Sequence, residues 1–342
     1  ERQKNERLPY PPASPAPLLD FSLVTHDLLE WFHNHKRNLP WRKKRTPYHV
    51  WLSEAMLQQT QVATVIPYFE RWLKKFPTVQ DLANAPLDDV LKQWERLGYY
   101  RRARNLHKAA QIIAFDKKGV FPTTYEGWLE LPGIGSYTAA AISSIVNGEK
   151  VLVVDGNVKR VAARLFMIKG EVSEKEAKKR LEPYLPEVKP GDFNESLMEL
   201  GATICTPKNP KCLFCPVNDF CKAHQKGQVD KFPNPKLKKE IPQRHRYALV
   251  NIQNDAIWLR QRGESEMLGG LWGFVLVDDK PKGQVLPDVT HVYTHFRLTV
   301  TPVIGKISKK TEGKFIPLTE LDKYALSTLD YKILKTALDS NL

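Results

Sequence analysis

Cysteine is scarce in this chain of 342 residues: there are four, and all of them lie between positions 205 and 221. A secreted scaffold held by disulfides spreads its cysteines along the chain, so this crowding argues against that class of protein. It is typical instead of a metal site in a reducing compartment. No signal peptide stands out in the first residues, and we therefore expect an intracellular location, the cytoplasm or the nucleoid in a bacterium.

Long apolar runs are also missing, although 42% of the residues are hydrophobic. A membrane-spanning helix needs about 20 consecutive apolar residues, so we expect sizeable packed cores and no membrane partner. Acidic residues are outnumbered, 38 against 52 basic ones, which gives a net charge of +14. An excess of this size favours a polyanionic partner, and we predict a nucleic acid.

The texture of the sequence changes along a chain that is long enough for two or three domains. Residues 1–22 are polar and then proline-rich, which predicts a flexible leader. Helical periodicity dominates residues 23–226. A basic linker stiffened by prolines follows over 227–245, and strand-like segments then predict an α+β domain over 246–342.

A short turn within the helical region is its most informative feature. The segment 131–135 reads Leu-Pro-Gly-Ile-Gly, and Gly133 and Gly135 allow the backbone to turn sharply and to approach another surface closely. We predict a helix-hairpin-helix in which 128–131 closes the first helix and 136–146 forms the second. The first N–H groups of such a helix bind phosphate oxygens. An ordinary corner of an all-helical protein is the alternative interpretation.

Two carboxylates stand among apolar neighbours. Asp155 ends the hydrophobic run 151–154, where an acid is expected to be a placed group rather than a solvated one. The amides of Gly156 and Asn157 follow it, and we expect them to lower its pKa and keep it ionised. Glu54 lies in the helix predicted over 48–61, where apolar neighbours raise the pKa of a carboxyl and suit it to donate a proton. Composition alone favours a solvated helix glutamate at this position.

The cysteines are spaced as Cys205-x6-Cys212-x2-Cys215-x5-Cys221. Four thiolates in one compact loop can hold a tetrahedral zinc ion or an iron–sulfur cluster, and the spacing alone does not choose between them. Lysines alternate with the cysteines, so we expect the outside of the loop to be positively charged and suited to contact with phosphates.

Together these residues resemble the helix-hairpin-helix DNA glycosylase superfamily over about residues 25–225. The cysteine spacing is similar to that of the endonuclease III branch, and this resemblance implies a four-iron four-sulfur cluster on the four cysteines. Tyr137 stands where bifunctional members of that branch carry a catalytic lysine. This tyrosine and the segment 51–60 are similar to the MutY-type adenine DNA glycosylases. The segments 39–42, 98–101 and 154–158 match that family as well.

The resemblance implies a multi-domain protein. An all-α helix-hairpin-helix glycosylase domain with an iron–sulfur loop is followed by an α+β Nudix-like domain that reads 8-oxoguanine. The segment 263–266, Gly-Glu-Ser-Glu, is not followed by the paired acids of a Nudix hydrolase box. We therefore expect this second domain to bind nucleotides without hydrolysing them.

The implied activity is release of adenine opposite 8-oxoguanine in double-stranded DNA, by a monomeric enzyme that hydrolyses the N-glycosidic bond and leaves the strand intact. Glu54 is expected to protonate the adenine ring, Asp155 to stabilise the sugar cation, and Tyr137 and Asn157 to position these groups. The implied contacts with base or duplex are Trp41, Arg42, Gln59, Tyr99, Gly133, Gly135, Glu199, Tyr293, Thr294 and His295.

Several of these assignments have a structural alternative. Tyr99 also fits a core aromatic residue beyond a helix end, and Glu199 a buried ion pair. The segment 293–295 reads Tyr-Thr-His where the family usually has Phe-Ser-His, and it also fits the end of a β-hairpin strand. Thr294 keeps a hydroxyl that can read the oxidised edge of guanine.

Two other functions compete with this interpretation. An endonuclease III-like lyase acting on oxidised pyrimidines is disfavoured by Tyr137 and by the additional domain. A non-catalytic DNA-binding module fits the basic charge and the hairpin equally well. The pair of Glu54 and Asp155 distinguishes the glycosylase from such a module.

Overall fold

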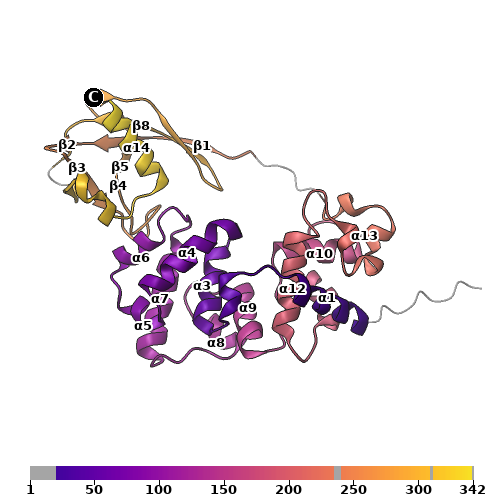
Figure 1. Cartoon of the computed structure of the whole chain (residues 1–342). Helices are drawn as coiled ribbons and strands as arrows, with labels where there is room; N and C mark the ends of the chain where they lie inside the picture. The colour runs from indigo at the N-terminus through magenta and orange to yellow at the C-terminus, as the bar shows by residue number, and fades with distance from the viewer. Residues whose placement is uncertain (1–20, 235–239, 309–310, 341–342) are drawn as a thin grey trace, which may run out of the picture. The chain divides into compact units, whose positions relative to one another are not determined.

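The computed structural model describes residues 21–234, 240–308 and 311–340 (Figure 1). Residues 1–20 of the predicted leader and 235–239 of the predicted linker lie outside this part. The chain divides into two compact units, Glu1–Arg37 with Lys150–Pro235 and Asn38–Glu149 with Lys236–Leu342. We call them the first and the second unit. The helical region predicted over 23–226 therefore contributes to both units, and its middle part groups with the C-terminal residues.

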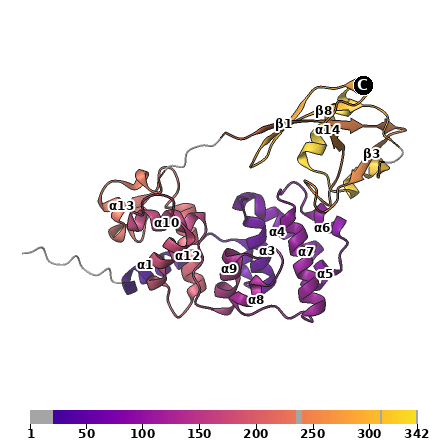
Figure 2. The same ribbon diagram turned by 180° about the vertical axis from the view of Figure 1, so that it is seen from behind.

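The first unit is helical. Its helices are α1 (Phe21–His35), α10 (Gly156–Phe166), α11 (Glu174–Leu181), α12 (Pro190–Thr203) and α13 (Lys222–Gln225), with 3-10 turns η2 (Glu182–Tyr184), η3 (Cys212–Phe214), η4 (Asn218–Phe220) and η5 (Val229–Lys231). Helix α12 packs against both α1 and α10, and the three helices lie close together in both views (Figures 1 and 2). Apolar side chains such as Leu28, Val158 and Phe193 form the core. The Ser173 side chain accepts the hydrogen bond of the Glu176 N–H and caps α11.

The second unit begins with a helical part over residues 38–149. Its elements are α2 (Pro40–Lys43), α3 (Pro47–Leu57), α4 (Val62–Lys75), α5 (Val79–Asn84), α6 (Leu87–Gln93), α7 (Arg101–Gln111), the π-helix η1 (Ile112–Asp116), α8 (Tyr125–Leu129) and α9 (Ser136–Asn147). Helix α3 contacts α4, α7 and α9 and is apolar around most of its circumference, as a central helix must be. It begins as predicted, because the Thr46 side chain accepts from the His49 N–H and Pro47 follows. It ends at Leu57 rather than Gln61, since Gln59 adopts a φ of 56° that no helix residue can have.

The C-terminal part of the second unit, residues 240–340, is mixed. Its strands are β1 (Gln243–Val250), β2 (Ile252–Gln253), β3 (Ala256–Gln261), β4 (Trp272–Gly273), β5 (Val275–Val277), β6 (Gln284–Val285), β7 (Val289–Val292), β8 (Arg297–Ile304) and β9 (Lys314–Pro317), with the 3-10 segment η6 (Leu318–Lys323) and helix α14 (Thr328–Asp339). One sheet has the order β5-β1-β8-β6, with β7 also paired to β8. The other has the order β2-β3-β4, with β9 paired to β3.

Strand β1 lies parallel to β8 from the pair Gln243–Arg297 to the pair Val250–Ile304. It begins inside the segment predicted as linker, because pairing with β8 orders residues whose polar side chains stay exposed. Apolar residues of both sheets and of α14 form the core of this part. Among the helices of the described residues, none combines the length and the apolar character that a bilayer crossing requires.

Candidate functional site

Glu54 lies on α3 and is buried, with 6% of its surface exposed. The hydroxyl of Tyr137, the second residue of α9, donates a 2.6 Å hydrogen bond to its Oε2. The surrounding α3 side chains, from Trp51 to Met56, are buried as well. The structure thus brings together two residues that the sequence predicted for the site, a carboxyl in apolar surroundings and a phenol that is bonded to it.

The two glycines of the hairpin turn have different roles. Gly133 adopts a φ of +77°, and a Cβ added there would lie 2.5 Å from the Cβ of Asn105 on α7. Only glycine fits a left-handed position this crowded. Gly135 is the N-cap of α9 at a φ of −100°, and an added Cβ would meet nothing within 4 Å. Gly133 therefore fixes the turn, and Gly135, as the N-cap, brings no side chain of its own to the start of α9.

Asp155 is the N-cap of α10 in the first unit. Its Oδ1 accepts from the Val158 N–H at 2.7 Å, and its Oδ2 accepts from the Asn157 side-chain amide at 2.8 Å. Burial nevertheless raises the pKa of this carboxyl above its ordinary value, while the hydrogen bonds from Val158 and Asn157 oppose the shift. The expectation of a lowered pKa was therefore wrong, because the loss of solvation outweighs the hydrogen bonds.

Asn157 is held in turn by Arg160, whose Nη2 donates to the Asn157 Oδ1 at 2.8 Å. The same nitrogen donates to the carbonyl of Gly201, and Nε donates to the carbonyl of Cys205, both at 2.8 Å. Gly201 lies so close to Asn157 that a Cβ added to Gly201 would be 2.6 Å from the Asn157 Cβ. Sequence reasoning missed both Arg160 and Gly201. The two carbonyls that Arg160 contacts, those of Gly201 and Cys205, lie 41 and 45 residues away in the chain, and no local sequence pattern marks such contacts.

The four cysteines lie around the turns η3 and η4, and all have free thiols. Burial, followed by smaller effects of neighbouring cysteines, raises the pKa of Cys215 to about 12. The pKa values of Cys212 and Cys221 are raised for the same reason. Such thiols ionise only when a metal centre takes the place of the proton. Arg164, buried beneath them, approaches the Cys205 Sγ with Nη1 at 3.4 Å and donates to the Thr206 carbonyl at 2.7 Å.

This donor set fits an iron–sulfur cluster. Within the described ranges, no three His, Cys, Asp or Glu side chains are arranged around a single metal ion. Four thiolates that share one zinc ion must crowd within about 4 Å of one another, given a Zn–S distance of about 2.3 Å. In a four-iron cluster each thiolate binds a different iron, so the sulfurs lie farther apart. The four cysteines within residues 205–221 supply one thiolate for each iron.

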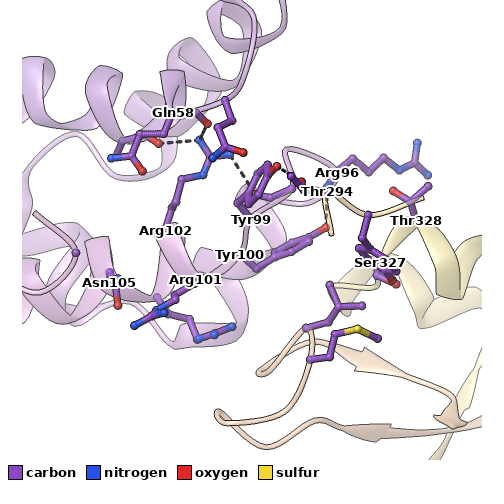
Figure 3. Close-up of a pocket in the computed structure, with 18 of the residues that line it drawn as sticks. Gln58, Arg96, Tyr99, Tyr100, Arg101, Arg102, Asn105, Thr294, Ser327 and Thr328 are labelled. Carbon is purple, nitrogen blue, oxygen red and sulfur yellow. Dashed lines mark hydrogen bonds between the residues drawn. The ribbon is translucent and has the colours of Figure 1, made fainter. Parts of the chain in front are cut away.

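Two residues predicted to enter the duplex lie at exposed turns of the second unit. Gln59 has a φ of 56°, and Tyr99 has a φ of 48° with 45% of its surface exposed. The guanidinium of Arg102, on α7, lies between the two turns (Figure 3). Its Nη1 donates to the carbonyl of Gln58 at 2.7 Å, and its Nη2 donates to the carbonyl of Gly98 at 3.2 Å. Sequence reasoning missed this arginine, which ties both turns together.

Residues 293–296 form the turn between β7 and β8, as the hairpin alternative held. The Tyr293 ring packs between His291 and Phe296, with centroids 4.6 and 4.9 Å away. Burial raises the pKa of Tyr293 to about 12, and its hydroxyl has no hydrogen-bond partner among the described residues. Thr294 and His295 are exposed, and the Thr294 hydroxyl makes a short hydrogen bond with that of Tyr99.

This bond closes one side of a cavity of about 640 Å³ within the second unit (Figure 3). Its walls come from the end of α3, the start of α7, the hairpin turn and the β7–β8 turn. Gln59, Tyr99, Gly133 and residues 293–295 all line it. Four sequence-separated segments that were each predicted to contact DNA therefore share one surface.

Three other predicted residues lie elsewhere. The Trp41 ring is buried in the helical core against Phe69, with centroids 5.5 Å apart, and Arg42 follows it on α2. Neither lines the cavity. Glu199 is 1% exposed and accepts two hydrogen bonds from the Arg37 guanidinium, at 2.7 and 2.9 Å. The ion-pair alternative for Glu199 is thus present in the structure, and the roles of Trp41 and Arg42 at a base remain predictions.

Comparison with known families assigns three segments. Residues 52–187 match the HhH-GPD superfamily base excision DNA repair proteins, 205–221 match the iron–sulfur binding domain of endonuclease III, and 246–336 match the NUDIX domain. The chain is 36% identical over 301 residues to an adenine DNA glycosylase of Buchnera aphidicola from Schizaphis graminum, covering 82% of this chain and 87% of that protein. The chain belongs to the adenine DNA glycosylase family.

Mammals carry similar proteins as well. The adenine DNA glycosylase of Rattus norvegicus is 35% identical over 381 residues, covering 87% of this chain and 74% of that protein. The one from Homo sapiens is 45% identical over 216 residues, covering 59% and 40%. Membership in this family makes the chain a DNA glycosylase, as the resemblance predicted.

Solved structures agree with the fold. A thermostable thymine-DNA glycosylase is 29% identical with a TM-score of 0.55, covering 60% of this chain and 97% of that protein. An endonuclease III trapped on DNA is 23% identical with a TM-score of 0.53, covering 61% and 99%. The predicted fold class, a helical helix-hairpin-helix domain followed by an α+β Nudix-like domain, is confirmed. So is the four-iron four-sulfur cluster, through the match over 205–221.

Proposed function

We propose that this DNA glycosylase releases adenine from its mispair with 8-oxoguanine in double-stranded DNA by hydrolysis, and that it leaves the strand uncut. The observation that carries the proposal is the hydrogen bond from Tyr137 to Glu54. It puts a phenol rather than an amine beside the buried acid. The names of the relatives support adenine as the base.

Release of a purine requires that the departing base is neutralised. A carboxylic acid in apolar surroundings is suited to this task because burial favours its protonated form. Glu54 has such surroundings, and in the proposal it transfers a proton to a ring nitrogen of adenine as the N-glycosidic bond breaks. The Tyr137 hydroxyl holds the carboxyl in the orientation that proton transfer requires.

Bond cleavage leaves a positive charge on the sugar. A carboxylate stabilises such an oxocarbenium ion or traps it covalently until water attacks. We assign this role to Asp155, which has to be ionised to act. Hydrogen bonds from Val158 and Asn157 favour the ionised form against the effect of burial.

Strand cleavage by lyases of this superfamily depends on an amine that forms a Schiff base with the opened sugar, and a phenol cannot do this. The product of this enzyme is therefore an abasic site in an intact strand. When bound, the iron–sulfur cluster would cross-link the 205–221 loop through the four cysteines and would take no part in the chemical steps.

Binding involves the duplex and the lesion. The net charge of +14 and the glycine N-cap at the start of α9 support contact with phosphates. The adenine has to leave the base stack to reach a buried acid, and Gln59 and Tyr99 are proposed to occupy the duplex as it does so. Thr294, exposed beside Tyr99, is proposed to read 8-oxoguanine. The crowding of all four cysteines into the 205–221 loop, rather than into disulfides along the chain, supports a reducing, intracellular location.

Single-turnover assays on three matched duplexes test the proposal. Adenine is placed opposite 8-oxoguanine, guanine or thymine, and each product is analysed with and without alkali. We expect fast, alkali-dependent cleavage opposite 8-oxoguanine, slower cleavage opposite guanine and none opposite thymine. Cleavage without alkali, or efficient borohydride trapping, would point to a lyase instead. Binding without base release in every duplex would point to a non-catalytic module.

A further inference from the structure

The two parts of the second unit meet in a cluster beside the Tyr99 turn. The helical part contributes residues at the end of α6 and in the turn after it, and the C-terminal part contributes residues from η6 to α14. We call this the docking cluster; its members are Lys92, Glu95, Arg96, Tyr324, Leu326 and Tyr331.

Glu95 is the centre of the docking cluster. Its Oε1 accepts from the Leu326 N–H at 2.9 Å and from the Tyr331 hydroxyl at 3.0 Å. Its Oε2 accepts from Lys92 at 2.9 Å, and Lys92 also donates to the Tyr324 carbonyl at 3.0 Å. Only 13% of the Glu95 side chain is exposed. Loss of the carboxylate would leave partly buried donors on both sides without an acceptor, a costly change.

Other contacts also join the helical part of the second unit to its C-terminal part. The Arg96 guanidinium lies over the Tyr331 ring, 4.7 Å from its centroid. Leu271 and Ala325 of the C-terminal part belong to the apolar core of the helical part. A Cβ on Gly270 would lie 2.9 Å from the Leu91 Cδ1, so the Gly270 backbone packs closely against the Leu91 side chain. An exposed ion pair, Lys108 with Glu264, also crosses the boundary, with side chains 49% and 62% exposed.

The docking cluster continues directly into the turn that carries Tyr99. Arg96, Gly98 and Tyr99 all have positive φ values, 69°, 78° and 48°, which leaves this turn little freedom to adapt. The Arg96 N–H donates to the hydroxyl of Tyr100 at 2.9 Å, which fixes the turn further (Figure 3). Across the cavity, the Tyr99 hydroxyl meets Thr294. The position of the C-terminal part on Glu95 therefore sets the distance between Tyr99 and Thr294.

We propose that Glu95 is a positioning residue for lesion discrimination: it fixes the C-terminal part on the Tyr99 turn, so that Thr294 is held where the base opposite adenine is read. This inference rests on the proposed function and assigns Glu95 no part in the chemistry. It predicts that loss of Glu95 lowers the preference for 8-oxoguanine over guanine and spares the cleavage of adenine opposite guanine.

A double-mutant cycle tests this role. The rate of single-turnover adenine release is measured opposite 8-oxoguanine and opposite guanine, and the ratio of the two rates is the readout. Glu95→Gln should lower the ratio about tenfold, within the usual range of coupling between sites, with the rate opposite guanine unchanged. In a Thr294→Ala background the same substitution should change the ratio little, because both residues act through one contact.

Two further variants sharpen the test. Tyr331→Phe removes a single hydroxyl from the docking cluster and should lower the ratio of the two rates by a smaller factor than Glu95→Gln does. If Glu95→Gln does not fold, Tyr331→Phe is the variant that tests the role of the docking cluster. Lys108→Ala breaks the exposed ion pair across the same boundary and should leave the ratio unchanged, since exposed pairs contribute little.

The outcomes separate this inference from the proposed function. A wild-type protein that cleaves both duplexes equally would overturn the proposed function, and the inference with it. A wild-type preference that survives Glu95→Gln and Tyr331→Phe would overturn the inference alone. So would equal losses on both duplexes, additive effects with Thr294→Ala, or the same loss in Lys108→Ala.

Discussion

The hydroxyl of Tyr137 lies 2.6 Å from the Oε2 of Glu54, although 83 residues separate them in the chain. The bond joins the helix that follows the hairpin turn to the most buried helix of the second unit. A displacement of the hairpin would therefore move the hydrogen-bond partner of the acid directly. Because a carboxyl and a phenol form the pair, the two side chains suit proton transfer and not amine chemistry.

The first prediction concerns the two members of this pair. Glu54→Gln removes the proton that neutralises adenine and should slow base release at least about 1,000-fold, at the upper end of general acid contributions. Tyr137→Phe keeps the acid and removes only its hydrogen bond, so we expect a loss of about tenfold. Single-turnover rates and binding of the same duplex by fluorescence anisotropy check both. Equal losses in the two variants, or loss of binding in Glu54→Gln, would contradict the division of roles.

The second prediction separates activity from stability at Asp155. Burial raises its pKa in the folded protein, so the unfolded chain releases this proton at a lower pH than the native state does. Stability therefore falls as pH rises from the ordinary pKa of aspartate through the raised one, and ionised Asp155 lowers stability at neutral pH. Asp155→Asn removes that charge and keeps an acceptor for the Val158 N–H as N-cap. It should be inactive and at least as resistant to heat as the wild type at pH 7. A melting temperature clearly below the wild-type value would contradict this prediction.

The third prediction concerns the side-chain amide of Asn157, whose hydrogen bond to Asp155 lowers the pKa that burial raises. Activity that needs ionised Asp155 is lost as pH falls through its pKa. Asn157→Ala removes the hydrogen bond that lowers this pKa, so the acid limb of the single-turnover rate should move to higher pH. The loss of activity should then be larger at pH 5 than at pH 8. Gln58→Ala, which changes an amide in the second unit, serves as control and should leave the limb in place. An unmoved limb in Asn157→Ala would show that this hydrogen bond does not control the titration.

Asp155 also shows which properties of the site can be predicted from the sequence and which cannot. Its place after the run 151–154 predicts an acid that is placed rather than solvated, and the structure contains Asp155 as the half-buried N-cap of α10. The direction of its pKa shift depends on how completely distant segments cover it, and no local pattern contains that information. Short strands such as β6 and β7 were not predicted for a related reason. With two and four residues, they are defined by pairing with β8 and not by their own alternation.

Interactions between distant segments were the main omission. Arg102 and Arg160 bond mostly to backbone carbonyls, and a backbone acceptor has no sequence signature. Two partners of Glu95, the Leu326 N–H and the Tyr331 hydroxyl, lie 231 and 236 residues away in the chain. The hairpin, the cysteine spacing and the buried acids were visible because each is built from neighbouring residues. What fixes their positions was not visible, since it depends on the tertiary structure.

The fourth prediction concerns the β7–β8 turn. Thr294→Ala removes the hydroxyl that meets Tyr99 and should narrow the preference for 8-oxoguanine over guanine about tenfold, a usual value for one lost hydrogen bond to a base edge. Thr294→Ser restores the hydroxyl and should retain most of the preference. His245→Ala, whose imidazole bonds to Thr301 on the same sheet, controls for general disturbance of the C-terminal part. Full discrimination by Thr294→Ala would exclude this turn as the lesion reader.

The last prediction concerns Arg102, which joins the Gln59 and Tyr99 turns. Its guanidinium donates to the carbonyls of Ala55, Met56 and Gln58 at 2.7–2.8 Å, where the end of α3 carries partial negative charge. Burial lowers its pKa to about 10, so it stays charged at neutral pH. Arg102→Gln leaves several of these carbonyls without a donor and should cost about 2–3 kcal/mol of stability.

The effect on activity should exceed what lost stability explains. Gln59 and Tyr99 both have strained backbone conformations, which persist only where neighbouring contacts hold them. Without the guanidinium the two turns relax, and the enzyme should extrude the base less often, whereas binding through phosphates is retained. We expect a slower rise of 2-aminopurine fluorescence beside the mispair and an equally slower cleavage. Arg102→Lys keeps the charge but cannot span both turns, so it should recover stability more than extrusion. Arg71→Gln is the matched control, because Arg71 donates to the carbonyl of Gln93 alone among backbone acceptors of the described residues. If Arg102→Lys recovers extrusion fully, charge rather than the span of the guanidinium holds the turns.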